Sequence, residues 1–395
     1  MAEEVIQEVE TKRERLKFID MARSIAILLM LEGHFIGLTL NQAYRDDNNP
    51  LYFTWNFIRG FTAPMFFTVT GVVFVYLLTN QQKAGFFKNR RVSKGFSRAF
   101  ELIFWGYMLQ LNFQHIVDYL HGDFNEWSTA FHVLQSIGVG IAMLLLIYGI
   151  YKIIKKGGLW FYYFLAATLL FSFYPYLKNL PEGQYALDGW PMIIQNMIKG
   201  PHSVFPIIPW VAFTLYGGMV GALLNRFHEH VRKVWFPLTF IGLGIVLNIF
   251  GYTIFKAIDQ LSKMIHFSEN LDFVFNAWLY GRLGQVLIVI GILMFIEKYF
   301  KIKDSLFIKI GQNTLQIYIV HVMVLYSGIF GVGLNHYIKN SLTPAQAILS
   351  AIGFILVFVI FVKFLPAIEK PYQKLEQIVL WPFKKARDWV FTKFS

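Results

Sequence analysis

The sequence of 395 residues contains no cysteine and few charged residues. Without cysteine, the chain has no disulfide, no thiolate nucleophile and no metal site with thiolate ligands. Charged residues make up 15% of the chain, whereas about a quarter of an ordinary water-soluble protein is charged. Hydrophobic residues reach 56%, and the mean hydropathy is +0.48. This composition excludes an ordinary water-soluble domain and predicts a membrane protein.

Apolar runs recur along the whole chain, each long enough to cross a hydrocarbon core of about 30 Å as a helix. The expected fold class is all-α, a polytopic membrane helical bundle of about ten transmembrane helices. No internal repeat is evident, and no pair of spans has the Gly/Pro interruptions of many inverted-repeat transporters. The spans are expected at 18–40, 53–79, 96–117, 129–151, 159–177, 203–224, 235–256, 277–299, 311–330 and 344–366.

Lysine and arginine are distributed unevenly between the connecting segments. If the N-terminus is cytoplasmic, 26 of the 36 Lys and Arg residues fall in cytoplasmic segments and 5 in loops on the other side. Because cytoplasmic loops carry an excess of these residues, both termini are expected to be cytoplasmic. The net charge of +12 then follows from membrane orientation, so no nucleic-acid partner is expected.

The two ends of the chain differ in composition from its centre. Residues 1–17 carry charges of both signs without a cleavable apolar core, which predicts a cytoplasmic tail rather than a signal peptide. Residues 18–366 form the expected transmembrane domain. Residues 367–395 mix aromatic residues with Lys384 and Arg387, a pattern that predicts a cytoplasmic amphipathic tail on the lipids of the inner leaflet.

The first span, FIDMARSIAILLMLEGHF, contains four ionisable residues, Asp20, Arg23, Glu32 and His34. A charge at the bilayer centre costs about 2.5–3.5 kcal/mol on insertion scales, so such residues usually face a cavity. Arg23 and His34 share one face of the helix, about 16 Å apart along its axis. Glu32 points roughly away from His34. The partner that orients His34 is therefore expected on another helix, either Asn56 or an amide of the third span.

Polar residues of several other spans fall at a similar depth. His34, Arg59 and Arg282 each lie about 8–9 Å below the outer end of their helix. In the same outer half lie Glu32, Asn56, Asn112, Gln114, His115, His132 and Gln135, while His321 lies near the middle of the ninth span. Together these residues predict a hydrated cavity. For any one of them, a local hydrogen bond that locks the bundle is the structural alternative.

This arrangement predicts a site served from both faces of the membrane. An anionic donor would dock near Arg23, and its reactive end would reach His34, where an acceptor enters from outside. A neutral His34 can take a hydroxyl proton as general base. Arg59 would favour that neutral form by charge repulsion and stabilise a developing oxyanion. His321 is the third candidate catalytic residue. The structural alternative at the mouth is a salt bridge between Asp20 and Arg23.

Several motifs resemble integral-membrane acyltransferases. RLKFIDMARSIAILLMLEGHF (15–35) is similar to their opening helix, and its Arg23-to-His34 spacing resembles that of acyltransferase-3-like envelope O-acetylases. Four later segments resemble the heparan-alpha-glucosaminide N-acetyltransferase-like group and keep its order. These segments are FIRGFTAPMFFTVTG (57–71), VLQSIGVG (133–140), FPIIPWVAFTLYGGMVGALL (205–224) and GQNTLQIYIVH (311–321). Ser24 and His132 depart from the family pattern, and His132 leaves the acceptor open.

The resemblance implies transmembrane acyl transfer in the cytoplasmic (inner) membrane. Acetyl-CoA, or another acyl-CoA, would be the co-substrate, and a hydroxyl or amino group of an envelope glycan or lipid-linked sugar the acceptor. His34 would act as base or as transient acyl carrier. Arg23, beside Asp20, would be the donor-side residue, and no metal is implied. In the basic loop 81–98, phosphate contacts could come from Lys88, Arg90, Arg91 and Lys94, although orientation alone also explains these charges.

Two other functions also explain ionisable residues inside the membrane. The first is a transporter or flippase with a polar site near the midplane, although the absence of repeat symmetry counts against it. The second is a non-catalytic subunit of an envelope complex. Release of free CoA would separate both from an enzyme. The sequence leaves a homodimer open.

Overall fold

The computed structural model describes residues 16–80, 85–123, 125–181, 183–265, 272–326 and 330–394, so most of the expected tail 1–17 lies outside it. Within these ranges the chain is helical, with two isolated β-bridges, which confirms the all-α fold class. The helices are α1 (Lys17–Thr39), η2 (Gln42–Tyr44), α2 (Pro50–Thr79), α3 (Arg90–Met108), α4 (Phe113–Leu120), η3 (Glu126–Thr129), α5 (Val133–Ile154), α6 (Leu159–Lys178), α7 (Met192–Ile198), α8 (Ile207–Arg226), η4 (His228–His230), α9 (Trp235–Ile249), α10 (Gly251–Met264), α11 (Phe275–Tyr299), α12 (Leu306–Gln312), α13 (Thr314–Tyr326), α14 (Asn335–Ile338) and α15 (Pro344–Phe394).

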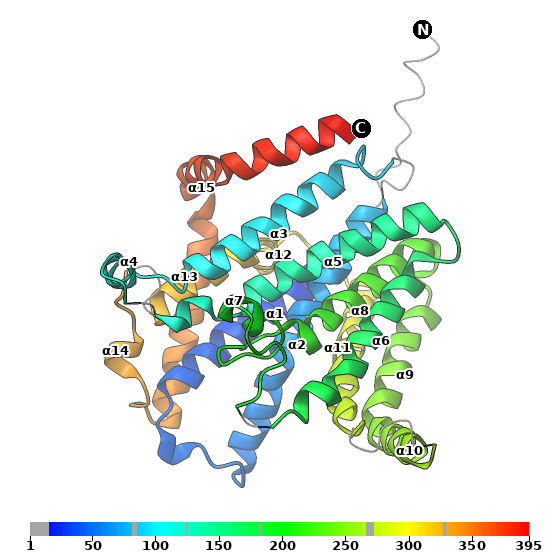
Figure 1. Cartoon of the computed structure of the whole chain (residues 1–395). Coiled ribbons are helices and arrows are strands. Elements are labelled where there is room, and N and C mark those ends of the chain that lie inside the picture. The colour runs from blue at the N-terminus through cyan, green and yellow to red at the C-terminus, as the bar shows by residue number, and fades with distance from the viewer. Residues whose placement is uncertain are drawn as a thin grey trace.

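The first helix, α1, lies at the centre of the bundle. It contacts α2, α11, α12, α13 and α15. Around it, α2 packs against α8, α8 against α6, α11 against α9, and α3 against α5. Figure 1 shows α9 and α10 on one side of this arrangement and α15 on the other. Polar side chains on α1 can therefore meet side chains of several other helices.

Glycines bring α2 and α8 into backbone contact. A Cβ on Gly71 would collide with the backbone of Thr214, and a Cβ on Gly217 with the backbone of Thr68. Small residues at such a seam let two membrane helices approach closely, which increases their van der Waals contact. This seam fixes α2, the helix that carries Arg59.

Side-chain hydrogen bonds stabilise the N-termini of the helices that carry the site. The Glu297 carboxylate, on α11, accepts hydrogen bonds from the backbone N–H of Lys17 at 2.9 Å and of Phe18 at 2.7 Å. These are donors without an intrahelical partner at the start of α1, where negative charge is favourable. The Asn49 and Asn89 side chains cap α2 and α3 in the same manner. The ends of α1, α2 and α3 are thereby fixed.

The expected count of ten spans is not confirmed. In the described part of the chain, six helices are long and apolar enough to cross a membrane, or seven if α9 and α10 count as one bent span. These seven correspond to the first, second, fourth, sixth, seventh, eighth and tenth expected spans. The third expected span, α3, carries too many charged residues to count as a membrane-spanning helix. The fifth, α6, is rich in tyrosine, which lowers its mean hydropathy. The orientation of the termini stays a prediction.

Three expected spans also differ in their course. The third ends at Met108, and 113–120 forms the separate helix α4. The seventh bends by 58° between α9 and α10, where the sequence becomes amphipathic. The ninth is interrupted at Asn313, whose φ of −111° and ψ of 33° end α12. Its second part, α13, would reach only about 20 Å.

The final helix, α15, continues past residue 366 and contacts α3. Figure 1 shows its red C-terminal part running across one end of the bundle, near α3. The Phe383 ring stacks on Phe100 with centroids 3.9 Å apart, and Arg387 donates a hydrogen bond to Ser97. The segment 367–395, which was expected to lie on lipid, therefore also contacts α3.

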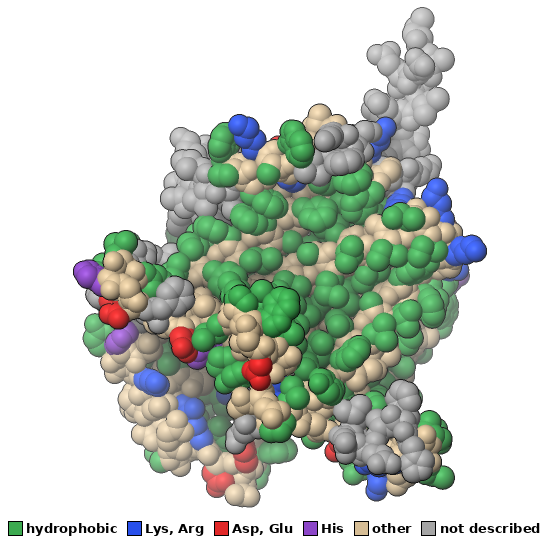
Figure 2. Space-filling view, viewed as in Figure 1, with side chains coloured by type: hydrophobic (Ala, Val, Ile, Leu, Met, Phe, Trp, Pro, Cys, Tyr) green, Lys and Arg blue, Asp and Glu red, His purple; other side chains and the backbone are tan. Residues whose placement is uncertain are grey.

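Hydrophobic side chains cover most of the face seen in Figure 2, and charged side chains lie mainly at its margins. Exposed apolar residues on this and other surfaces include Leu146, Leu165, Leu169, Ile249 and Ile292. A water-soluble protein rarely exposes apolar patches of this extent. The pattern is the one expected of helices that face lipid.

Candidate functional site

A cavity of about 840 Å³ lies beside the middle and C-terminal part of α1. Its lining comes from several helices and includes His34 of α1, Arg59 of α2, Gln135 of α5 and Tyr326 of α13. We call it the His34 cavity. Its position agrees with the hydrated cavity predicted from the depth of the polar residues. Among its described lining residues there is no carboxylate, and Arg59 is the one permanently charged side chain.

His34 forms a pair with His321, which is fully buried on α13. The His34 Nδ1 atom lies 2.9 Å from His321 Nε2, and the ring centroids are 5.2 Å apart. The expectation that Asn56 or an amide of the third span orients His34 was wrong. Sequence spacing could not find this partner because 287 residues separate the two histidines.

The second nitrogen of His321 fixes the direction of hydrogen bonding in the pair. His321 Nδ1 lies 3.2 Å from the carbonyl oxygen of Ile317, which can only accept. A neutral His321 therefore carries its hydrogen on Nδ1 and accepts at Nε2 from His34 Nδ1. A neutral His34 then has its lone pair on Nε2, the nitrogen that can accept a further proton.

Arg59 packs its side chain along α1 next to His34. A Cβ on Gly33 would lie 3.2 Å from Arg59 Cγ, and one on Gly37 would lie 3.3 Å from Arg59 Cζ. The guanidinium carbon lies 5.5 Å from the centroid of the Trp55 ring, and the side chain is exposed. Arg59 forms no salt bridge with a described carboxylate, but the Glu32 carboxylate, which accepts a hydrogen bond from Trp55, is close enough to interact with its charge. Its charge acts on Glu32 as well as on the His34 cavity that it lines.

The other residues expected in the cavity divide into two groups. Asn56, His132 and Gln135 line the His34 cavity, together with Arg59. Glu32 lies outside the lining and accepts a hydrogen bond of 2.6 Å from Trp55 Nε1. Its position agrees with the expectation that it points away from His34. The side chain of His115 lies outside the described residues.

Arg282 lies in a helix seam rather than in the lining. Its Nη1 donates to the Phe57 carbonyl at 3.0 Å and to Gln285 Oε1 at 3.1 Å, and its guanidinium lies 4.6 Å from the centroid of the Phe57 ring. These contacts join α11 to α2. Depth along a span could not distinguish such a seam position from a cavity position.

Aromatic residues form a large part of the His34 cavity, and sequence reasoning did not identify them as site residues. Trp127, Trp210, Trp278 and Tyr326 all line it. The Tyr326 ring lies edge-on to His34 with centroids 6.0 Å apart. Buried or confined aromatic rings offer flat apolar surface together with one polar group. Their position near the outer ends of expected spans was a usable signal, but it is also the ordinary pattern of membrane interfaces.

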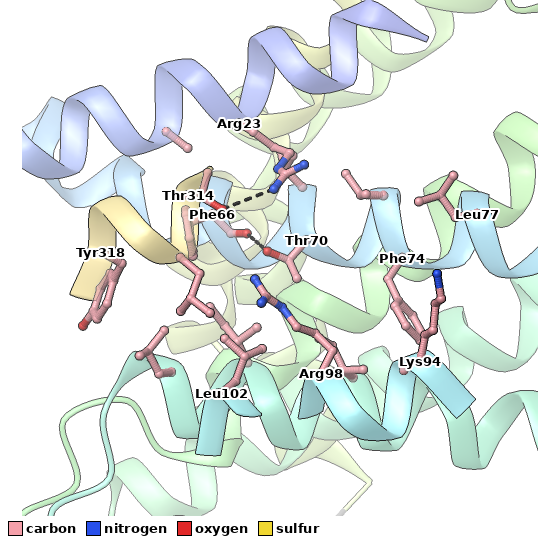
Figure 3. A pocket seen from close by; sticks show the side chains of 18 of the residues that line it. Arg23, Phe66, Thr70, Phe74, Leu77, Lys94, Arg98, Leu102, Thr314 and Tyr318 are labelled. Atoms are coloured by element: carbon pink, nitrogen blue, oxygen red, sulfur yellow. Dashed lines mark hydrogen bonds between the residues drawn. The ribbon is translucent and has the colours of Figure 1, made fainter. Parts of the chain in front are cut away.

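A second cavity, of about 220 Å³, lies beside the N-terminal half of α1. Four cationic side chains line it: Arg23 of α1, and Arg91, Lys94 and Arg98 of α3. We call it the Arg23 cavity. Figure 3 shows Arg23 and Arg98 pointing into it from two helices, with Lys94 and Tyr318 at opposite ends of the view. The remainder of its lining is mostly apolar.

Arg23 also has the structural contacts that the alternative interpretation predicted. Its Nη1 lies 3.8 Å from Asp20 Oδ1, and its Nη2 donates to Thr314 Oγ1 at 3.2 Å. Asp20 is buried and does not line the cavity. The salt bridge holds the guanidinium at the wall of the cavity, so the structural contact and a role in binding are compatible.

The basic segment before and within α3 contributes only part of its charge to the cavity. Arg91 and Lys94 line it, whereas Lys88 and Arg90 do not. Arg98, which sequence reasoning did not select, lines it as well and bonds Glu101 at 2.9 Å. Residues 91, 94 and 98 are spaced by three and four, which places them on one face of a helix. That spacing is visible in the sequence and could have identified Arg98 as a cavity residue.

The chain belongs to the acyltransferase-3 family. The family model described as an acyltransferase domain matches residues 16–363, which include both cavities' residues on α1, α2, α3, α5 and α13. No curated protein matches the chain. Together with the long apolar helices, the family identifies a multi-pass membrane acyltransferase. The described residues contain no cluster of three His, Asp or Glu side chains that could hold a metal ion.

Proposed function

We propose that the protein transfers an acetyl group from cytoplasmic acetyl-CoA to a hydroxyl or amino group of an envelope glycan or lipid-linked sugar on the opposite face. One observation carries this proposal. His34, which pairs with His321, lines a large cavity, and Arg23, about 16 Å from it along the same face of α1, lines a cationic cavity. The two cavities suit two substrates that approach the same helix from opposite ends.

The Arg23 cavity is the proposed donor site. Acyl-CoA is a polyphosphate with a long, chain-like arm that ends in a thioester. Arginine and lysine bind phosphate by charge-assisted hydrogen bonds. The cavity of about 220 Å³ is smaller than the roughly 300–1,000 Å³ of pockets that enclose a whole ligand. It would therefore hold the arm, while the phosphates would lie at its cationic mouth.

The histidine pair supplies the proposed chemistry. His34 Nε2 takes the proton of the acceptor hydroxyl while the oxygen attacks the thioester carbonyl carbon. The carbonyl oxygen becomes an oxyanion, which the Arg59 guanidinium stabilises. The carbon–sulfur bond then breaks, and His34 returns the proton to the leaving thiolate, which gives free CoA thiol and the acyl ester. An amino acceptor gives an amide by the same steps.

His321 has a positioning role in this mechanism. Its Nε2 accepts from His34 Nδ1, which keeps the lone pair of His34 on Nε2 and stabilises the imidazolium that forms. The same arrangement would serve a route in which His34 Nε2 first takes the acyl group. Both routes release one CoA thiol for each acyl group transferred.

Thiol release by the purified protein tests the proposal. Wild type and His34→Ala in detergent are given acetyl-CoA, with and without an envelope-glycan extract, and free thiol is followed. We expect release that the extract stimulates in wild type and that is lost in the variant. A well-folded wild type that neither binds nor cleaves acetyl-CoA would contradict the proposal. It would leave the transporter or non-catalytic subunit as the interpretation.

A further inference from the structure

Three side chains line both cavities. Phe66 of α2, Leu134 of α5 and Tyr318 of α13 border the His34 cavity and the Arg23 cavity alike. Leu134 is 2% exposed and Tyr318 is 8% exposed, so little of either is open to solvent. Of the three helices that carry these residues, α2 and α13 pack against α1, and α5 packs against α2. The two cavities therefore meet at one apolar partition.

The α2 helix shows the order of the two cavities and the partition along a single face. Thr62 lines only the His34 cavity, Phe66 lines both, and Thr70 lines only the Arg23 cavity. These positions are four residues apart, so they follow one another on the same side of the helix. Thr70 Oγ1 donates to the Phe66 carbonyl at 2.8 Å. Phe66 is thus the residue that separates one cavity from the other on α2.

The partition is also adjacent to the histidine pair. Tyr318 precedes His321 by three residues on α13, and their ring centroids are 5.0 Å apart. His34 lies on the far side of the partition from Arg23, since each residue lines a different cavity. An acyl group carried from the Arg23 cavity to His34 has to pass between these side chains.

We infer that Phe66, Leu134 and Tyr318 form a constriction that separates the two cavities and selects the acyl group by its cross-section. The inference rests on the proposed function for the direction of acyl transfer. An acyl chain enters such a constriction end first, so a straight chain presents the same width whatever its length. Branching next to the carbonyl increases the width. The constriction should therefore discriminate against branched acyl groups more than against straight ones.

The constriction also keeps water of the His34 cavity from the donor thioester until the acyl group has passed. Excluding water prevents hydrolysis of a reactive group. Uncoupled hydrolysis would break the carbon–sulfur bond and form a carbon–oxygen bond to water, which gives the free acid and CoA thiol. Widening the constriction should raise this release in the absence of any acceptor.

The natural absence of cysteine allows a direct test of the separation. Thr62→Cys and Thr70→Cys, each alone, are placed in vesicles of one orientation and exposed to a small charged thiol reagent on either face. We expect labelling of the two cysteines from opposite faces. In a Phe66→Ala or Leu134→Ala background, each cysteine should also be labelled from the wrong face.

Ile137→Ala is the matched control. Ile137 lies one turn after Leu134 on α5, is also 2% exposed, and lines only the Arg23 cavity. Ile137→Ala removes as many side-chain atoms as Leu134→Ala from an equally buried position that does not line both cavities, so each cysteine should still be labelled from one face only. Phe66→Leu, which keeps an apolar side chain, replaces Phe66→Ala if that variant is not recovered folded.

Acyl selection is tested with butyryl-CoA and isobutyryl-CoA, which have the same number of carbons and differ in branching. We expect wild type to prefer butyryl-CoA, and Phe66→Ala to raise the relative kcat/KM for isobutyryl-CoA about tenfold. An unchanged ratio, or a cysteine that reacts from both faces in wild type, would overturn the constriction. Sided labelling in a protein that cleaves no acyl-CoA would overturn acyl selection together with the proposed function, because labelling requires no turnover.

Discussion

The two cavities beside α1 differ in size, charge and wall. The His34 cavity is about four times larger, and its lining includes aromatic rings, His34 and one arginine. The Arg23 cavity is small and apolar inside, with four cationic side chains in its lining. A single chamber for two substrates would not need this contrast. The difference supports the proposal that the Arg23 cavity receives the charged, chain-like donor and the His34 cavity the acceptor.

Arg23 and Arg59, one in each cavity, differ in their partners. Arg23 has Asp20 and Thr314 as partners, which hold it at the wall of its cavity. Arg59 forms no salt bridge with a described carboxylate, although Glu32 is close enough to interact with its charge, and it lies against Gly33 and Gly37. A cation held by a salt bridge suits ground-state binding of a phosphate, whereas a cation without a salt bridge, next to the proposed base, suits a charge that develops during reaction. Substitutions in each cavity distinguish donor binding at the Arg23 cavity from chemistry at the His34 cavity.

His34→Ala should have the largest effect. We expect kcat to fall by about 10²- to 10⁴-fold, because the proposed general base is lost. The donor Kd should change little, since His34 does not line the Arg23 cavity. The protein should still fold, because cavity water can replace the bond to His321. Thiol release, acetyl-CoA binding and thermal unfolding would be measured on the same sample. Loss of activity only through failure to fold would remove the support for catalysis.

His321→Asn should have the next largest effect. The substitution removes the acceptor that holds His34 Nδ1, so we expect kcat to fall about 10- to 100-fold with an unchanged KM for the donor. A merely structural residue would lower the yield of folded protein and leave kcat per folded molecule intact. Comparing kcat and KM with the folded fraction distinguishes the two cases.

Arg91→Ala and Arg90→Ala form a matched pair of neighbouring charge deletions. Arg91 lines the Arg23 cavity and Arg90 does not. We expect Arg91→Ala to raise the KM for acetyl-CoA about tenfold, the loss expected for one charge-assisted contact, and Arg90→Ala to change it little. Arg23→Ala should resemble Arg91→Ala. Equal effects at positions 90 and 91 would mean that only the overall positive charge matters.

Ionic strength should have the smallest effect. Phosphate contacts at an exposed mouth are screened by salt, so the Kd for acetyl-CoA should rise about threefold between 0.1 and 1 M salt. The rise should be smaller in Arg91→Ala, which has one cation fewer. Binding measured by titration in both proteins checks this. A Kd that is independent of salt in wild type would indicate that the donor is held by apolar contacts alone.

The sequence predicted the helical class and the two ends of the site on α1. Low charge and long apolar runs identify membrane helices, and residue spacing places Arg23 and His34 on one face of one helix. The spacing of Arg91, Lys94 and Arg98 also places these three residues on one face of a helix. These features depend on local geometry, which is regular enough to read from one segment.

Contacts between distant segments could not be predicted in this way. The pairing of His34 with His321 depends on how α13 packs against α1, and the break at Asn313 that sets the position of α13 has no strong sequence signal. Arg282 looked like a cavity residue because its depth is right, yet its direction is set by α2. The count of ten spans is not confirmed where polar aromatic or charged residues lower the hydropathy of otherwise helical segments.

The central claim is that donor and acceptor reach α1 from opposite faces of the membrane. The most direct test places the wild-type protein in vesicles of known orientation, with labelled acetyl-CoA on one face and an envelope-glycan extract on the other. We predict that label enters the extract when acetyl-CoA is on the face of the Arg23 cavity and the extract is on the face of the His34 cavity. Incorporation only when both are on the same face would contradict the account.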